Sequence, residues 1–222
     1  MPSKNDPSNP STTSEYFMLK LLTASFLALF IVLSPVSANS SEDQLVQALS
    51  STQMAREVVV KVVSQDPAVG SSCSAVVISA GKALTAAHCI DIPDMAIKYD
   101  DGRILPVQVA LPDVMGRDLA TLFVAGLVGP SAVTTDSPVQ ADELVYAVGY
   151  PYGIGNVLTV GQFQFRVFNP SDGQSYLIST VMVGPGNSGG ALFVVRDGIP
   201  YLVGIVVAYA GSPHLAVSVE LP

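Results

Sequence analysis

Short apolar runs, punctuated by glycine, proline and aspartate, follow one another through most of the chain and constrain its fold more than any other feature. They are rich in Val, Ile, Leu and Tyr, and no helical periodicity intervenes between them. The runs are EVVVKVVS, SSCSAVVISA, KALTAAH, MAIKYD, RILPVQVAL and DLATLFVAG, then ELVYAVGY, NVLTVGQFQFRVF, SYLISTVMV, ALFVVRDG, PYLVGIVVAYA and LAVSVEL. Regularly spaced short strands of this kind predict an all-β sandwich or barrel.

Residues 129–142 (GPSAVTTDSPVQAD) separate the two sets of runs and have the composition of a linker. About six strands are expected on each side of it. The predicted domains are therefore 39–128, which includes a short leading helix, and 143–222. Ser41 and Gln44 form a capping box for that helix.

Residues 1–38 have the layout of a polar extension followed by a secretory signal peptide. A basic start at Lys20 precedes an apolar run over 21–36, and small residues lead to Ala38. Cleavage after Ala38 would leave a secreted or periplasmic protein with no stable membrane association. The alternative is a protein anchored in the membrane by residues 19–36.

The formal net charge of −8 argues against nucleic acid as a partner, because phosphate binding needs clustered Lys and Arg. No cofactor and no metal are expected. The chain lacks Cys-x-x-Cys, and His214 is the only histidine besides His88. Cys73 and Cys89 are either a disulfide, which an exported protein can keep, or two buried free thiols.

Three motifs carry the groups that nucleophilic catalysis needs. GNSGG at 186–190 places Ser188 between glycines, which let backbone N–H groups turn toward one spot near the side-chain oxygen. TAAHC places His88 among small residues at the end of a strand, and DLATL opens a strand with Asp118. A carboxylate there can accept the Nδ1 hydrogen bond of the imidazole and leave Nε2 free as a base. Taken singly, each motif also fits an ordinary turn, surface histidine or strand end.

Together the motifs resemble the trypsin/chymotrypsin-like serine protease family, whose groups follow in the order His, Asp, Ser. The resemblance covers residues 56–219. It implies two perpendicular six-stranded antiparallel β-barrels with the active site in the cleft between them, and a protein or peptide substrate. His88 would be the general base and then acid, Asp118 would orient it, and Ser188 would be the nucleophile.

Further features follow from the same resemblance. The backbone N–H groups of Gly186 and Ser188 would form the oxyanion hole, and Cys73 and Cys89 would be a disulfide pair. Animal digestive members have an aspartate before the nucleophile, which pairs with a newly released N-terminus. Asn187 stands at that position here. Activity is therefore expected not to depend on such an ion pair.

The segments GYPYG at 149–153 and PGNSGGAL at 185–192 are similar to bacterial HtrA-type and glutamyl-endopeptidase-like relatives. HtrA proteins usually carry a PDZ domain after the protease, and none is expected here because the chain stops at Pro222. The resemblance also implies five residues of the primary substrate pocket: Met182, Val183, Val207, Ala208 and Tyr209. None is charged, so a small or medium apolar side chain is expected before the scissile bond. Alternatively, His214 lines the pocket and favours an acidic residue.

Two other interpretations remain. An α/β-hydrolase is one, because GNSGG also satisfies Gly-x-Ser-x-Gly and is followed by Asp197 and His214 in that fold's order. It requires a helix directly after the serine, whereas residues 191–195 have the pattern of a strand. The other is a catalytically inactive protease-like domain retained for binding. The oligomeric state is not predicted by the sequence.

Overall fold

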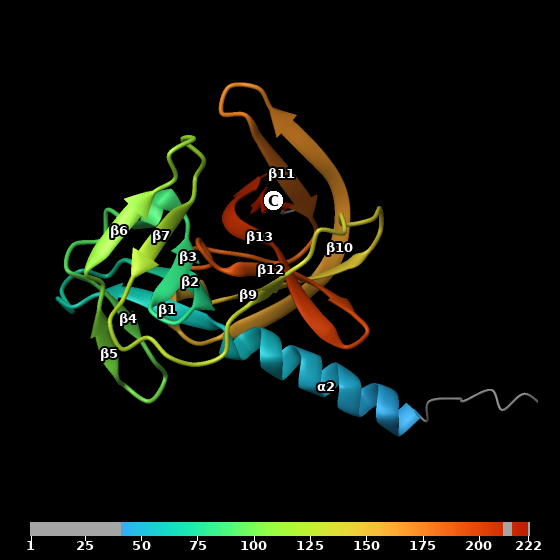
Figure 1. Cartoon of the computed structure of the whole chain (residues 1–222), viewed down its shortest axis with the longest axis horizontal. Coiled ribbons are helices and arrows are strands. Elements are labelled where there is room, and N and C mark those ends of the chain that lie inside the picture. The colour runs from blue at the N-terminus through green and yellow to red at the C-terminus, as the bar shows by residue number, and fades with distance from the viewer. Residues whose placement is uncertain (1–40, 211–214, 222) are drawn as a thin grey trace, which may run out of the picture. The chain divides into compact units, whose positions relative to one another are not determined.

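The computed structural model describes residues 41–210 and 215–221. The regular structure in these ranges is almost entirely β-strand, as Figure 1 shows. Residues 1–38, predicted to be an extension with a signal peptide or an anchor, lie outside the described residues, and so does His214.

Helix α2 (Ser41–Glu57) precedes the strands. Its Ser51 hydroxyl donates a hydrogen bond of 2.7 Å to the Gly198 carbonyl oxygen, and Arg56 donates one of 2.7 Å to the Asn156 carbonyl oxygen. Within the described part of the chain, no helix is both long and apolar enough to cross a membrane.

The first sheet is antiparallel and contains the strands from the first half of the chain, in the order β5-β4-β1-β2-β3-β7-β6. These strands are β1 (Val59–Ser64), β2 (Ser72–Ser79), β3 (Lys82–Thr85), β4 (Met95–Lys98), β5 (Ile104–Pro106), β6 (Val109–Pro112) and β7 (Ala120–Phe123). The sheet curls into a half-barrel, and no pairing between its described edge strands β5 and β6 closes it.

The second sheet closes into a six-stranded antiparallel barrel in the order β12-β9-β10-β11-β14-β13, with β13 returning to β12. Its strands are β9 (Leu144–Gly149), β10 (Val157–Asn169), β11 (Gln174–Ser179), β12 (Ala191–Arg196), β13 (Ile199–Ala210) and β14 (Leu215–Glu220). The short strand β8 (Val133–Thr134) adds in parallel to β13. The predicted all-β, two-barrel fold is confirmed.

One apolar core spans both sheets. Val62, Val76 and Leu122 of the first sheet and Phe193 and Ile205 of the second are fully buried in the same cluster. Burying each such side chain contributes about 1.5–3 kcal/mol of stability. The shared core therefore fixes the first sheet against the second, and with them the loops that meet between them.

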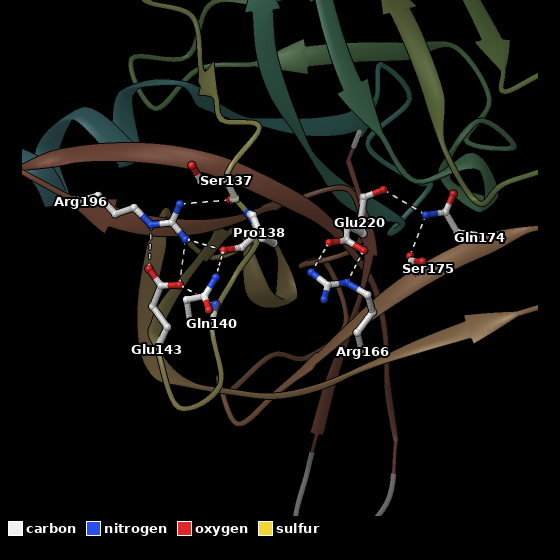
Figure 2. Close-up of polar contacts among 9 residues, drawn as sticks. All are labelled: Ser137, Pro138, Gln140, Glu143, Arg166, Gln174, Ser175, Arg196 and Glu220. Carbon is white, nitrogen blue, oxygen red and sulfur yellow. Dashed lines mark hydrogen bonds and ion pairs between the residues drawn. The ribbon is translucent and has the colours of Figure 1, made fainter.

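The connection between the sheets is held to the barrel by one guanidinium group. Arg196 of β12 donates to the carbonyl oxygens of Ser137 and Pro138 at 3.1 and 3.0 Å, as Figure 2 shows. It also pairs with the carboxylate of Glu143 at 2.9 Å. The end of the connecting segment therefore enters β9 from a fixed position.

Candidate active site

His88 and Asp118 lie together because their strands are neighbours. The 3-10 turn η1 (Ala87–Cys89) follows β3, and Asp118 precedes β7, whose Ala120 is registered against Thr85. His88 Nδ1 lies 2.8 Å from Asp118 Oδ2, and the His88 backbone N–H donates to Asp118 Oδ1 at 3.0 Å. Both carboxylate oxygens are engaged, so the ring is held with Nε2 directed away from the aspartate.

The same contacts move both pKa values. The hydrogen bond to Asp118 raises the pKa of His88 above its usual value, against the opposing effect of partial burial. Burial acts to raise the pKa of Asp118, but hydrogen bonds from the His88 ring and from the backbone N–H groups of His88 and Ala87 outweigh it and lower that pKa. The pair therefore favours an ionised carboxylate beside an imidazole that protonates readily.

Ser188 comes from the second sheet and meets the first through its main chain. Its carbonyl oxygen accepts a hydrogen bond of 2.8 Å from the Ser74 N–H of β2, and lies 3.8 Å from Cys89 Sγ. A disulfide joins Cys89 to Cys73 of β2. Ser188 therefore lies against the residue that follows His88. In the described part of the chain, no hydrogen bond joins the Ser188 hydroxyl to the imidazole.

The loop before Ser188 presents free backbone donors. Gly186 has a φ of 94°, a conformation that glycine adopts without strain. The Asn187 N–H donates a hydrogen bond to the Gly184 carbonyl oxygen at 3.0 Å. The Gly190 N–H donates one to the Asn187 carbonyl oxygen at 2.8 Å. Among the described residues, the N–H groups of Gly186 and Ser188 have no hydrogen-bond acceptor. These are the two donors predicted for an oxyanion hole.

Two buried polar residues support this loop and were not predicted from the sequence. The hydroxyl of Ser74, which is fully buried, donates to the Gly186 carbonyl oxygen at 2.8 Å and accepts from the Tyr150 N–H at 2.9 Å. Thr85 Oγ1 donates to the Ser74 carbonyl oxygen at 2.7 Å. The signal available in the sequence was a hydroxyl residue inside an apolar strand, which needs a partner when buried.

At Gly189 the serine loop packs directly against the first sheet. A Cβ at this position would overlap the Ser74 carbonyl oxygen and Thr85 Oγ1. Its φ of 81° is also one that L-residues rarely adopt. A glycine is therefore required directly after Ser188 for the serine loop to seat against β2 and β3.

The predicted pocket residues do not all meet in one cavity. Met182, which is 74% exposed, and Val183 line a pocket of about 230 Å³ together with Tyr152 and Asn187. The three predicted residues on β13 do not line it: Val207, Ala208 and Tyr209. Val207 is buried, whereas Tyr209 is 48% exposed.

The α/β-hydrolase interpretation is wrong. Residues 191–196 after the serine loop form strand β12, and not the helix that a nucleophile elbow requires. Among the described strands, every pairing except the short one between β8 and β13 is antiparallel.

Known protein families and proteins are similar to this chain. A protein-family model described as a trypsin-like peptidase domain matches residues 73–205. Serine endoprotease DegS of Salmonella typhimurium is 30% identical over 118 residues, which cover 50% of this chain and 33% of DegS. The alignment thus spans about a third of the length of that curated relative.

Solved structures show a similar fold. The serine endoprotease of Yersinia pestis has a TM-score of 0.66 and 24% identity, over 78% of this chain and 62% of that one. The HtrA-type protease AlgW with a tripeptide has a TM-score of 0.66 and 24% identity, and the match covers 78% of this chain and 59% of AlgW. Rv3671c of M. tuberculosis has a TM-score of 0.65 and 21% identity, and the match covers 79% of this chain and 86% of Rv3671c.

Proposed function

The chain belongs to the trypsin-like peptidase family, and from this premise we propose that it is a serine endopeptidase that hydrolyses protein or peptide substrates. The observation that carries the proposal is the two-point contact between His88 and Asp118, beside a glycine-flanked Ser188 that comes from the other sheet. Its DegS and HtrA-type relatives are proteases, which supports the same reaction class.

The proposed reaction has two halves. In the first, His88 Nε2 takes the Ser188 hydroxyl proton as the oxygen attacks the scissile carbonyl carbon, and the Gly186 and Ser188 N–H groups stabilise the resulting oxyanion. His88 then gives its proton to the leaving amine, the C–N bond breaks, and an acyl-enzyme remains. In the second half, His88 takes a proton from water as the water oxygen attacks the ester carbon. His88 then returns that proton to the Ser188 oxygen as the ester C–O bond breaks, which releases the acid and the Ser188 hydroxyl.

Asp118 has an electrostatic and a positioning role in this scheme. Its Oδ2 accepts a hydrogen bond from the His88 Nδ1–H and so selects the tautomer with a free Nε2. The raised pKa of His88 makes the ring a stronger base for the serine proton. Because the pKa of Asp118 is lowered, the carboxylate stays ionised while His88 carries the proton.

We also propose the finer features that the sequence predicts. The residue before the scissile bond would be apolar and small or medium in size. It would contact Met182 and Val183 in their pocket and, outside that pocket, the Val207–Tyr209 segment of β13. Residues 1–38 would direct export and be removed after Ala38, with retention as an anchor as the alternative. N-terminal sequencing of the protein isolated from its producing cells tests the cleavage.

The proposed activity is tested by incubating the purified full chain with a peptide library and identifying new termini by mass spectrometry. Wild type and Ser171→Ala, which alters an exposed turn serine, should cleave the library. Ser188→Ala and His88→Ala should leave it intact. Folded wild type that cleaves nothing would favour the alternative of an inactive binding module.

A further inference from the structure

Two lysines stand out among the cationic side chains. Four arginines form ion pairs with carboxylates: Arg103, Arg117, Arg166 and Arg196. Within the described residues, none of the lysines Lys61, Lys82 and Lys98 forms an ion pair. Lys82 instead lies over the Phe123 ring. Lys61 and Lys98 therefore carry positive charge that no ion pair among the described residues neutralises.

These two lysines are direct cross-strand neighbours. Lys61 of β1 is registered against Lys98 of β4, so both side chains leave the same face of the sheet. Like charges placed directly opposite each other are destabilising. A bound anion between them would remove that repulsion.

The pair lies in a groove without a carboxylate. Lys61 and Lys98 line a groove of about 330 Å³ with Ser72, Tyr152 and Gly153, and no Asp or Glu is among its lining residues. The Lys61 ammonium group donates to the Gly153 carbonyl oxygen. Lys98 is exposed and has no such bond within the described chain.

Nearby carboxylates face other groups. Asp66, in the loop that edges the groove, accepts the Ala68 N–H at 2.9 Å. Asp101 pairs with Arg103 at 2.7 Å, and Asp100 lines a different pocket with Arg56. None of these carboxylates forms an ion pair with Lys61 or Lys98.

The lysines lie one and two strands away from β2, the strand that bonds the main chain of Ser188. On its other side Lys61 is registered against Ser74, whose N–H bonds the Ser188 carbonyl oxygen. Adjacent strands are about 4.8 Å apart, so the backbones of β1 and β4 lie about 5 and 10 Å from that of β2. An extended peptide advances about 3.3 Å per residue, so its second or third residue beyond the serine would reach the lysines.

The direction of the substrate follows from the two flanks of Ser188. On one flank the Gly189 N–H bonds the Val206 carbonyl oxygen of β13, next to the segment proposed to bind the residue before the scissile bond. On the other flank is Ser74 of β2. The part of the substrate after the scissile bond would therefore leave over β2, toward Lys61 and Lys98.

We infer that Lys61 and Lys98 form a carboxylate-binding subsite for the leaving side of the substrate, which directs cleavage to bonds with an acidic group two or three residues downstream. This rests on the proposed peptidase function. The carboxylate is either an Asp or Glu side chain or the C-terminal group of a short peptide. Lys61 also tethers the turn at Gly153, so Lys98 is the residue to change.

The test uses the purified full chain and a peptide that it has been shown to cleave. Versions with Asp, Ala or Lys at the second and third positions after the cleaved bond are compared by kcat/KM. Wild type should prefer Asp over Lys by about fivefold at low salt, and the preference should shrink as salt rises. Lys98→Glu should abolish or reverse it, and the matched variant Lys82→Glu should retain it.

Two further arms separate the possible causes. Neutral peptides that end two residues after the bond, as free acid or as amide, show whether a terminal carboxylate is bound. A small nitrophenyl ester, which does not reach the groove, reports the serine chemistry alone. Ester turnover without any acidic preference, or with a preference unchanged in Lys98→Glu, would overturn this subsite and leave the peptidase intact. Ester turnover and peptide cleavage that persist in Ser188→Ala would overturn both.

Discussion

The Ser74 hydroxyl donates a hydrogen bond of 2.8 Å to the Gly186 carbonyl oxygen, so a buried serine of the first sheet holds the loop that carries the proposed oxyanion hole. The same hydroxyl accepts the Tyr150 N–H at 2.9 Å. One oxygen atom thereby sets the orientation of the peptide before Asn187 relative to β2. The geometry of the proposed reaction centre depends on a residue that would not touch the substrate.

Replacing Ser74 with Ala should therefore impair catalysis more than folding. It leaves the Gly186 carbonyl oxygen and the Tyr150 N–H without their partner, which costs about 1–3 kcal/mol. We expect slower acylation by a nitrophenyl ester in a protein that still unfolds cooperatively. Ser171→Ala is the control. Unchanged acylation in Ser74→Ala would show that the loop is held by other contacts.

Gly189→Ala should be strongly destabilising. The added methyl group overlaps the Ser74 carbonyl oxygen and Thr85 Oγ1, and the backbone is strained by a φ of 81°. Gly173→Ala is the matched control, because its φ of 66° gives strain while nothing lies near the added Cβ. Urea unfolding should show a loss of about 1 kcal/mol in the control and a larger loss in Gly189→Ala. Equal losses would mean that the serine loop does not pack as tightly as described.

The pH dependence follows from the His88–Asp118 pair. The proposed mechanism needs neutral His88, so kcat/KM should rise with pH through the raised pKa of that ring. Asp118→Asn removes the cause of the shift, so the rise should move to lower pH while the maximal rate falls by about 10⁴-fold. A pH–rate profile from pH 4 to 9 measures both. If the rise of kcat/KM at acid pH occurs at the same pH in wild type and Asp118→Asn, Asp118 does not cause the raised pKa of His88.

The pair should also affect the stability of the fold, with opposite pH dependence at its two members. A raised pKa of His88 stabilises the fold below the unfolded-state pKa, and this contribution is lost as pH rises through the folded-state value. The lowered pKa of Asp118 stabilises the fold above the unfolded-state value, and this is lost as pH falls. Thermal unfolding should be measured for wild type and Asp118→Asn across a range of pH. The difference in unfolding temperature between the two proteins should become smaller at acid pH, where Asp118 is protonated.

The disulfide should stabilise the fold and hold His88 in place. It closes a loop with a sequence separation of 16, for which loop entropy gives about 3 kcal/mol. The double variant Cys73→Ser/Cys89→Ser should therefore have a lower free energy of urea unfolding by about that amount. Reducing agent should lower the stability of wild type and leave the double variant unchanged. A reducing agent without effect on wild type would contradict the role of this bond.

Much of this site could be predicted because its chemistry depends on short contiguous motifs. The motifs TAAHC, DLATL and GNSGG each contain one residue of the proposed site. The antiparallel pairing of β3 with β7 then brings His88 to Asp118. Ser74 was missed because a serine within SSCSAVV looks the same whether it faces solvent or a distant carbonyl. Its partners are 76 and 112 residues away, and only the packed fold shows them.

Strand boundaries were less predictable for a similar reason. RILPVQVAL has the pattern of one strand, but the structure divides it into β5 and β6, which lie at opposite edges of the first sheet. The break at Val107 and Gln108 depends on long-range bonds, since their N–H groups donate to the carbonyl oxygens of Met95 and Phe123. Local propensity carries no information on such partners.

The most direct measurement of the central claim is covalent labelling of the native full chain with a fluorophosphonate, followed by peptide mapping. Such a reagent phosphonylates a serine that a neighbouring base has activated. Wild type should carry one label, on Ser188, while His88→Ala should remain unlabelled and Ser171→Ala should label as wild type. A folded wild-type protein with no label on Ser188, or with equal labelling in His88→Ala, would contradict the proposal that this serine is activated by that histidine.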